Sequence, residues 1–317
     1  MGLFPVYHTY CSEAFFRDTL AGSAYSSGWT QDADTILKIL ERASRLVDSY
    51  VGDQTFGPTT ETRLYDLGGS ESWYMNNGPL RSDPRPIRSN ARSLQTYDYR
   101  ASVVPLDRWL VSATTVTAYA DTARTTSDVL VEGIAEDYLL EPYNTAPKYR
   151  LKLNEDSTLA LGVGQQVLSI LGTWGWQYIT ASASTLSAAI TTTTATTLTV
   201  ASLGNHGAGN TIVVDSEQMY CTGHSSTTLT VRRGVNGTTA ATHLINAAVS
   251  IVEHPSDVKM VTADLARMQY RDRDLGVVET IGSGGQGTIT RSSSEMRSTL
   301  STLDHYRVAR DSAGLVF

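Results

Sequence analysis

The stretch "TTLTVRRGVNGTTAATH", residues 227–243, leads from a strand-like pentad through two arginines into a turn. Polar and apolar residues alternate in the pentad, and Asn236-Gly237 is typical of a type I′ turn because both residues tolerate positive φ. Gly234 beside this turn can form a bulge. The stretch therefore predicts a hairpin, with Arg232 and Arg233 at the end of its first strand.

The pentad "TTLTV" also occurs at residues 196–200, which indicates that one structural element is used twice. Further strands are expected at "NTIVVD", "EQMYCTG" and "AAVSIVE", because turn residues separate these apolar runs. From residue 180 the chain becomes rich in Ser, Thr and Ala, which marks a boundary. We predict an inserted all-β module at residues 181–254.

Helical periodicity lies on both sides of this module. Apolar residues recur at three- and four-residue steps in residues 32–51 and again in residues 257–274. A third, shorter helix is expected after residue 292, where Ser292 and Glu295 have the spacing of a capping box.

Short β runs, from "TETRLYDL" to "QQVLSILGTWGW", fill the region between the first helix and the boundary, and predict a small sheet packed by that helix. The predicted fold class is α+β: a small helical core with a short antiparallel sheet, carrying the inserted module and a C-terminal helix and tail. Residues 1–180 and 255–317 form the core in this interpretation.

Composition limits the function. The net charge of -7 argues against a protein that grips nucleic acid mainly through clustered Lys and Arg. The only two cysteines, Cys11 and Cys221, fall in different predicted elements, so we expect no disulfide framework and assembly in a reducing cytoplasm. The chain has no apolar run of transmembrane length and no signal-peptide pattern, so we expect a protein that is neither exported nor membrane-bound.

The segment from residue 68 to 101 is rich in Gly, Pro, Asn and Arg and predicts a long loop. Two interpretations stay open. The loop could be a protein-contact arm that uses Arg and aromatic side chains as anchors, which the acidic whole favours, or it could clamp nucleic acid by charge and stacking. The arginines that would make these contacts are Arg81, Arg85, Arg88 and Arg92.

Catalytic signatures are weak. "GSGGQG" at residues 282–287 satisfies the dinucleotide pattern G-x-G-x-x-G but follows an acidic helix where a buried strand is required, so it predicts a linker. A zinc site could draw on His206, His224, His243 and Cys221, yet zinc-ligand spacings are missing. We expect no enzyme activity, no cofactor and no metal.

Three segments in order carry a resemblance: "ASRLVDSYVGDQTFGPTTETRLYD", "DYLLEPYNTAPKYRLKL" and "QQVLSILGTWGW". Together they resemble the head-tail connector, or adaptor, proteins of long-tailed bacteriophages. The module with "GNTIVVDSEQMYCTG" looks like a small β domain that recurs in phage virion proteins.

The resemblance implies a non-enzymatic homo-oligomeric ring in the neck of the virion, commonly a dodecamer, assembled in the host cytoplasm. Such a ring lies under the portal protein, extends the DNA channel without specific binding, and receives a tail terminator or stopper protein below. By position, portal docking carries over to the C-terminal segment: Tyr306, Arg307, Arg310, Leu315, Val316 and Phe317.

Contacts between subunits or with partners are expected from charged helix faces and from exposed arginines. Besides the loop arginines, we expect Arg42, Arg45, Arg232 and Arg233 to make them. The alternative is a tail, baseplate or decoration protein whose β module binds a host surface ligand. It is weakened because Tyr220 is the only aromatic residue in the module.

Overall fold

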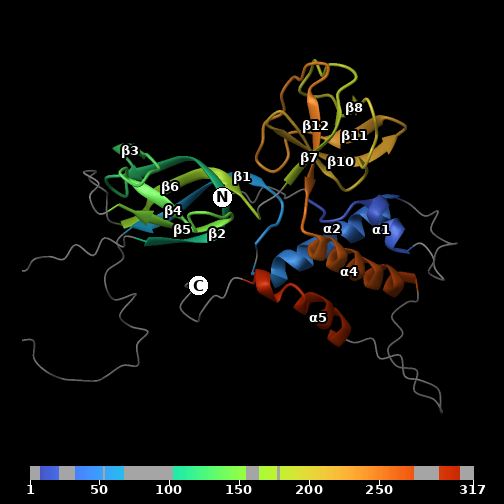
Figure 1. Ribbon diagram of the computed structural model, residues 1–317, viewed down its shortest axis with the longest axis horizontal. Coiled ribbons are helices and arrows are strands. Elements are labelled where there is room, and N and C mark those ends of the chain that lie inside the picture. The colour runs from blue at the N-terminus through green and yellow to red at the C-terminus, as the bar shows by residue number, and fades with distance from the viewer. Residues whose placement is uncertain are drawn as a thin grey trace, which may run out of the picture. The chain divides into compact units, whose positions relative to one another are not determined.

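The computed structural model describes residues 8–20, 33–52, 54–67, 103–154, 164–176, 179–274 and 293–307. They form two compact units (Figure 1). The helix-and-module unit comprises the described residues of Met1–Thr60 and Gly175–Val308, and the sheet unit comprises those of Glu61–Trp174.

The helices of the helix-and-module unit pack around an amphipathic pair. Their bounds are α1 Glu13–Leu20, α2 Ala33–Tyr50, α4 Ser256–Asp274 and α5 Ser293–Ser301, followed by the 3₁₀ turn η1 Asp304–Tyr306. On α2 the residues at helical spacing, such as Ile36, Leu40 and Val47, are fully buried, and α2 packs against α4. The periodicity read from the sequence thus predicted α2 and α4, and the capping-box helix is α5.

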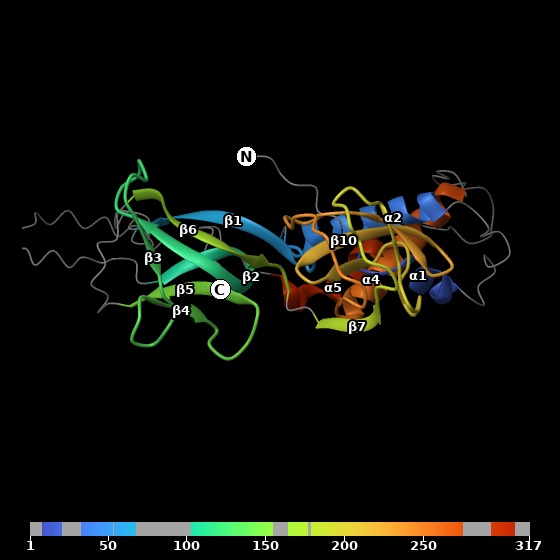
Figure 2. The same cartoon turned by 90° about the horizontal axis from the view of Figure 1, so that it is seen from above.

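The module is a six-stranded antiparallel sheet in the order β7-β12-β9-β10-β11-β8. Its own core contains Ile212, Met219, Leu229 and Ile251. Figures 1 and 2 show β10 lying over α2, and Leu37, Tyr220 and Val235 form the small apolar cluster between them. The strands are β7 Ile179–Thr185, β8 Thr197–Thr199, β9 Thr211–Val214, β10 Glu217–Ser225, β11 Thr228–Arg232 and β12 Ala248–Glu253.

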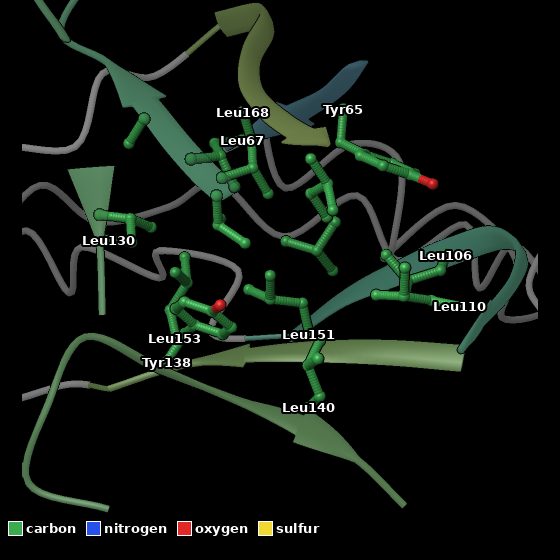
Figure 3. Packing of buried hydrophobic residues seen from close by; sticks show 14 of the residues in the cluster. Tyr65, Leu67, Leu106, Leu110, Leu130, Tyr138, Leu140, Leu151, Leu153 and Leu168 are labelled. Atoms are coloured by element: carbon green, nitrogen blue, oxygen red, sulfur yellow. The ribbon is translucent and has the colours of Figure 1, made fainter. Parts of the chain in front are cut away.

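The sheet unit has its own six-stranded sheet, which curves into a half-barrel. The order is β1-β6-β2-β5-β4, with β3 also paired to β2. Leu110, Leu151 and Leu168 point from different strands into one core (Figure 3). The strands are β1 Thr59–Leu67, β2 Val103–Tyr119, β3 Ser127–Leu130, β4 Tyr138–Glu141, β5 Lys148–Leu153 and β6 Gly164–Trp174.

The predicted fold class, a helical core with a short antiparallel sheet, is wrong. The described part of the chain is mostly β, with 40% of its residues in strands and 24% in helices. The error lies in the β runs after residue 57, which were expected to need a helix to cover their apolar face. Their inward side chains instead bury one another inside the curved sheet, so it holds a core of its own.

The opening motif is half confirmed. Asn236 and Gly237 both have positive φ, 57° and 83°, as a type I′ turn requires. Only glycine fits at 237, because a Cβ there would lie 1.8 Å from the carbonyl oxygen of Thr60. The hairpin itself is wrong: β11 pairs with β10 and β8, so the turn lies within a loop between β11 and β12 that are not neighbours.

Candidate functional site

The loop that follows β11 is folded around one buried carboxylate, Glu217. Its side chain accepts bonds from Arg233 at 2.6 and 2.7 Å, from the backbone N–H groups of Gly234 and Ala241 at 2.9 Å each, and it lies 2.8 Å from His243 Nε2. Burial raises the pKa of Glu217, but these hydrogen bonds outweigh burial and lower it. We call these five residues the carboxylate hub.

His243 joins the hub to Asp215. Its Nδ1 lies 2.7 Å from Asp215 Oδ2, while its Nε2 faces Glu217. A catalytic histidine needs one ring nitrogen to take a proton from a nucleophile, and here carboxylates occupy both. The hub therefore stabilises the loop and is not arranged for nucleophilic catalysis.

Arg233 belongs inside the hub, and its side chain is only 6% exposed. It also donates to the backbone oxygens of Thr192, Ala195 and Ala241. The Arg233 guanidinium, which the sequence predicted to contact a partner, therefore makes its hydrogen bonds within its own chain. Its neighbour Arg232, at the end of β11, is exposed.

The C-terminal strap, residues 302–307, is fastened to the helix-and-module unit by Tyr306. The Tyr306 ring packs edge-on against Phe56 and Trp176, with centroids 5.0 and 4.8 Å away. Its hydroxyl donates to Asp257 at 3.2 Å, and His305 lies 3.2 Å from the same carboxylate. Burial raises the pKa of Tyr306 to about 12.

A second set of contacts holds the strap to the end of α2. Tyr50 donates its hydroxyl to Asp304 at 2.5 Å, and the Arg307 guanidinium lies over the Tyr50 ring at 5.1 Å. Tyr306 and Arg307, two of the predicted docking residues, therefore contact their own chain. The others, Arg310, Leu315, Val316 and Phe317, lie outside the described residues.

The predicted contact arginines on α2 differ in their surroundings. Arg42 is exposed. Arg45 instead donates to the carbonyl of His8 at 3.0 Å, pairs with Asp48 at 3.1 Å and lies over the Tyr10 ring at 5.9 Å. Arg81, Arg85, Arg88 and Arg92, as well as the glycine motif at 282–287, fall outside the described residues.

The segment before α1 contributes buried groups that the sequence reasoning missed. Tyr10 is fully buried and donates its hydroxyl to Asp48, and the same oxygen accepts from the N–H of Phe56 at 3.0 Å. His8 bridges Thr211 and the carbonyl of Pro58, at 2.9 and 3.1 Å. The available signal was the dense aromatic run "YHTYCSEAFF", which is rich in side chains that favour burial.

A cleft of about 500 Å³ lies beside this segment. Its walls come from residues 9–15, 17 and 18, from residues 203–208, 210 and 211, from His224, and from residues 251–254 and 259. His206 and His224 line it, whereas His243 belongs to the hub and Cys221 packs in the module core. Within the described ranges no three His, Cys, Asp or Glu side chains gather closely enough to hold a metal ion.

The cleft also contains Cys11, the other of the two cysteines of the chain. Burial raises the pKa of its thiol to about 12 and that of Cys221 to about 11, so both are thiols and not thiolates at neutral pH. The cleft thus has histidines and a thiol, and burial keeps this thiol from being activated as a nucleophile.

None of the helices in the described part of the chain is both long and apolar enough to cross a membrane. Comparison with known proteins finds no similarity: no family model, no curated protein and no solved structure matches the chain.

Proposed function

We propose that the protein is a structural component of a phage neck, a homo-oligomeric ring that joins the portal to the tail and extends the DNA channel. The observation that carries the proposal is the fastened C-terminal strap. Tyr306 fixes the chain to the fold immediately before residues 308–317, whose sequence ends in Leu-Val-Phe. A segment that starts from a fixed point and ends in apolar residues suits docking into a neighbouring protein.

The polar constellations of the described residues support a structural role. The hub and the Tyr10-Asp48 contact consist of groups that bond one another, and each holds a loop or segment in place. The net charge of -7 also suits a channel through which DNA passes without being held.

The module offers a contact point for the next ring, the tail terminator or stopper. Leu244 and Ile245 are 80% and 55% exposed on a turn between His243 and β12. The turn is fixed on both sides, because His243 and Ile190 exchange backbone bonds of 2.8 and 2.9 Å and Asn246 donates to Leu186 at 2.9 Å. Two exposed apolar side chains on a fixed turn suit insertion into a hollow of another protein.

The alternative, a module that binds a host surface ligand, lacks an aromatic platform. Tyr220, the only aromatic residue of the module, is 1% exposed, and its hydroxyl donates to Glu41 at 3.0 Å. The module face that carries Tyr220 thus packs on α2, which favours the connector function.

The test is portal binding by the full chain and by a chain lacking residues 310–317. We expect the full chain to bind the portal of the same phage, and the shortened chain to keep its melting temperature but lose binding. Equal portal binding by both chains would show that residues 310–317 are not needed for docking. No binding by either chain would contradict the proposed function.

A further inference from the structure

The sheet unit carries an apolar knob on β3 and the loop after it. Val129, Val131 and Ile134 are 65%, 52% and 89% exposed, an unusual run of bare aliphatic side chains. Leu130, between the first two, points into the core (Figure 3), so Val129 faces outward by strand alternation. Exposed aliphatic side chains concentrated on one segment indicate a contact surface.

The knob is held in a fixed shape. Gly133 donates to the carbonyl of Tyr138 at 2.9 Å, and Val131 donates to the Asp137 carboxylate at 2.8 Å. Asn154, just after β5, donates from its side chain to the carbonyls of Ile134 and Glu136 at 3.4 and 2.7 Å. A contact surface that is ordered before binding loses less entropy when it binds.

Exposed carboxylates surround the knob. Asp128, Glu132 and Glu136 are exposed, and none forms an ion pair with a residue in the described ranges. A partner that binds this surface should offer apolar side chains together with positive charges that can pair with these carboxylates.

The same unit presents such a surface on the outer face of β5, which we call the basic strip. Arg150 and Lys152 alternate with the core residues Leu151 and Leu153, so they point away from the core. In the described part of the chain neither cation forms an ion pair, and Arg150 lies over the Tyr149 ring at 5.5 Å.

Apolar side chains flank both cations. Lys152 is opposite Leu139 on β4 and Val103 on β2, and Arg150 is opposite Pro105. Glu141 also faces Arg150 across the strands, but it accepts the hydroxyl of Tyr143 at 2.7 Å. Among the described residues, the strip is therefore a half-exposed apolar surface with two cations that form no ion pair, complementary to the knob.

We propose that the apolar knob of one subunit docks on the basic strip of the next copy in the ring. This inference rests on the proposed ring. In the proposed ring this contact is heterologous: each subunit gives its knob to one neighbour and its strip to the other, and the contact repeats until the ring closes. Val129, Val131 and Ile134 cover the apolar flanks of the strip, and the rim carboxylates face Arg150 and Lys152.

Nucleic acid is a poorer occupant of the strip. Two cations offer few phosphate contacts, and the carboxylates of Glu132, Glu136 and Asp137 lie on the same unit. The apolar flank at Leu139 and Val103 is better matched by aliphatic side chains than by a phosphate backbone.

The experiment uses two charge-reversed variants of the full chain, with ring formation measured by mass photometry and electron microscopy, alone and on the portal. The strip variant is R150E/K152E and the knob variant is E132K/E136K. In each variant the knob and the strip then carry charges of the same sign and repel each other. We therefore expect the protein concentration needed for ring formation to rise about tenfold or more. A 1:1 mixture should assemble again, because each variant's strip matches the other's knob.

The matched control is R124E/R297E, which reverses two exposed cations, one between β2 and β3 and one on α5, outside the knob, the strip and the charged faces of α2 and α4, and should leave assembly unchanged. Restored rings in the mixture also show that both variants are folded. Two results would overturn the knob-and-strip contact while the ring itself stands. One is normal ring formation by either variant alone. The other is a mixture that forms no rings although both variants have wild-type melting temperatures. Failure of the wild-type chain to form rings, alone or on the portal, would instead overturn the proposed function and this inference together.

Discussion

Replacing Glu217 with alanine should unfold the loop that the carboxylate hub supports. The substitution leaves the Arg233 guanidinium, whose side chain is 6% exposed, without its carboxylate. Breaking a buried ion pair from one side costs about 3–5 kcal/mol, and each backbone N–H left unbonded, here those of Gly234 and Ala241, costs about 1–3 kcal/mol more. We expect a total loss of at least about 5 kcal/mol, comparable with the whole stability of many domains.

Hydrogen exchange measured on peptides covering residues 228–247 is the most direct assay, because it reports the free energy of opening this loop alone. Urea unfolding followed by circular dichroism gives the stability of the whole chain. The double variant E217A/R233M should be less destabilised than E217A, because it removes the unpaired buried charge together with its partner.

The control is Glu253→Gln, which breaks the ion pair with Lys259. Those side chains are 34% and 27% exposed, so the loss should be at most about 1 kcal/mol. If E217A costs no more than E253Q, or if R233M fails to relieve E217A, the hub does not hold the loop as described.

Three further predictions concern the helix-and-module unit. Burial, together with the charges of Lys259 and Arg45, lowers the pKa of His254 from 6.5 to about 3, so the unfolded chain binds an extra proton between these values. The contribution of His254 to the free energy of unfolding should therefore fall as the pH drops below 6.5, by about 2 kcal/mol at pH 5. Urea unfolding at pH 7 and pH 5 checks this, and the same change in the free energy of unfolding between these pH values in H254Q as in the wild type would contradict it. Tyr306→Ala should speed hydrogen exchange of residues 293–307, because it removes two ring contacts and one hydrogen bond and lowers the free energy of opening this segment by about 2 kcal/mol. Y306F should lower it by about 1 kcal/mol, and equal exchange rates in the two variants would contradict the role of the Tyr306 ring in fastening the strap. Cys11 and Cys221 should resist thiol reagents until the chain unfolds, since both are buried with raised pKa values, and rapid labelling of the native protein would show that the burial is wrong.

Local pattern predicted most of the elements. The three-to-four spacing of apolar residues predicted α2 and α4, and alternation predicted the strands of the module from β8 to β12. The stretch rich in Ser, Thr and Ala that starts at residue 180 predicts a boundary, but most of β7 at Ile179–Thr185 lies in it, and the sequence did not predict α1 at Glu13–Leu20. α1 is too short for periodicity to separate it from a loop.

Pairing and burial could not be read in the same way. The half-barrel depends on which strands become neighbours, and β1 pairs with β6 about 100 residues later. Nothing local marked Glu217 among the 32 acidic residues, because its role arises only when Arg233 and His243 meet it in the fold. The predicted contact of Arg233 with a partner came from its place at a strand end, where exposure is common.

The central claim, that this chain assembles into a neck ring, is tested most directly by imaging the purified protein in negative stain and measuring its mass, alone and mixed with the portal of the same phage. The proposal predicts closed rings of a single subunit number, formed alone or on the portal. A monomer at all concentrations that ignores the portal would contradict it.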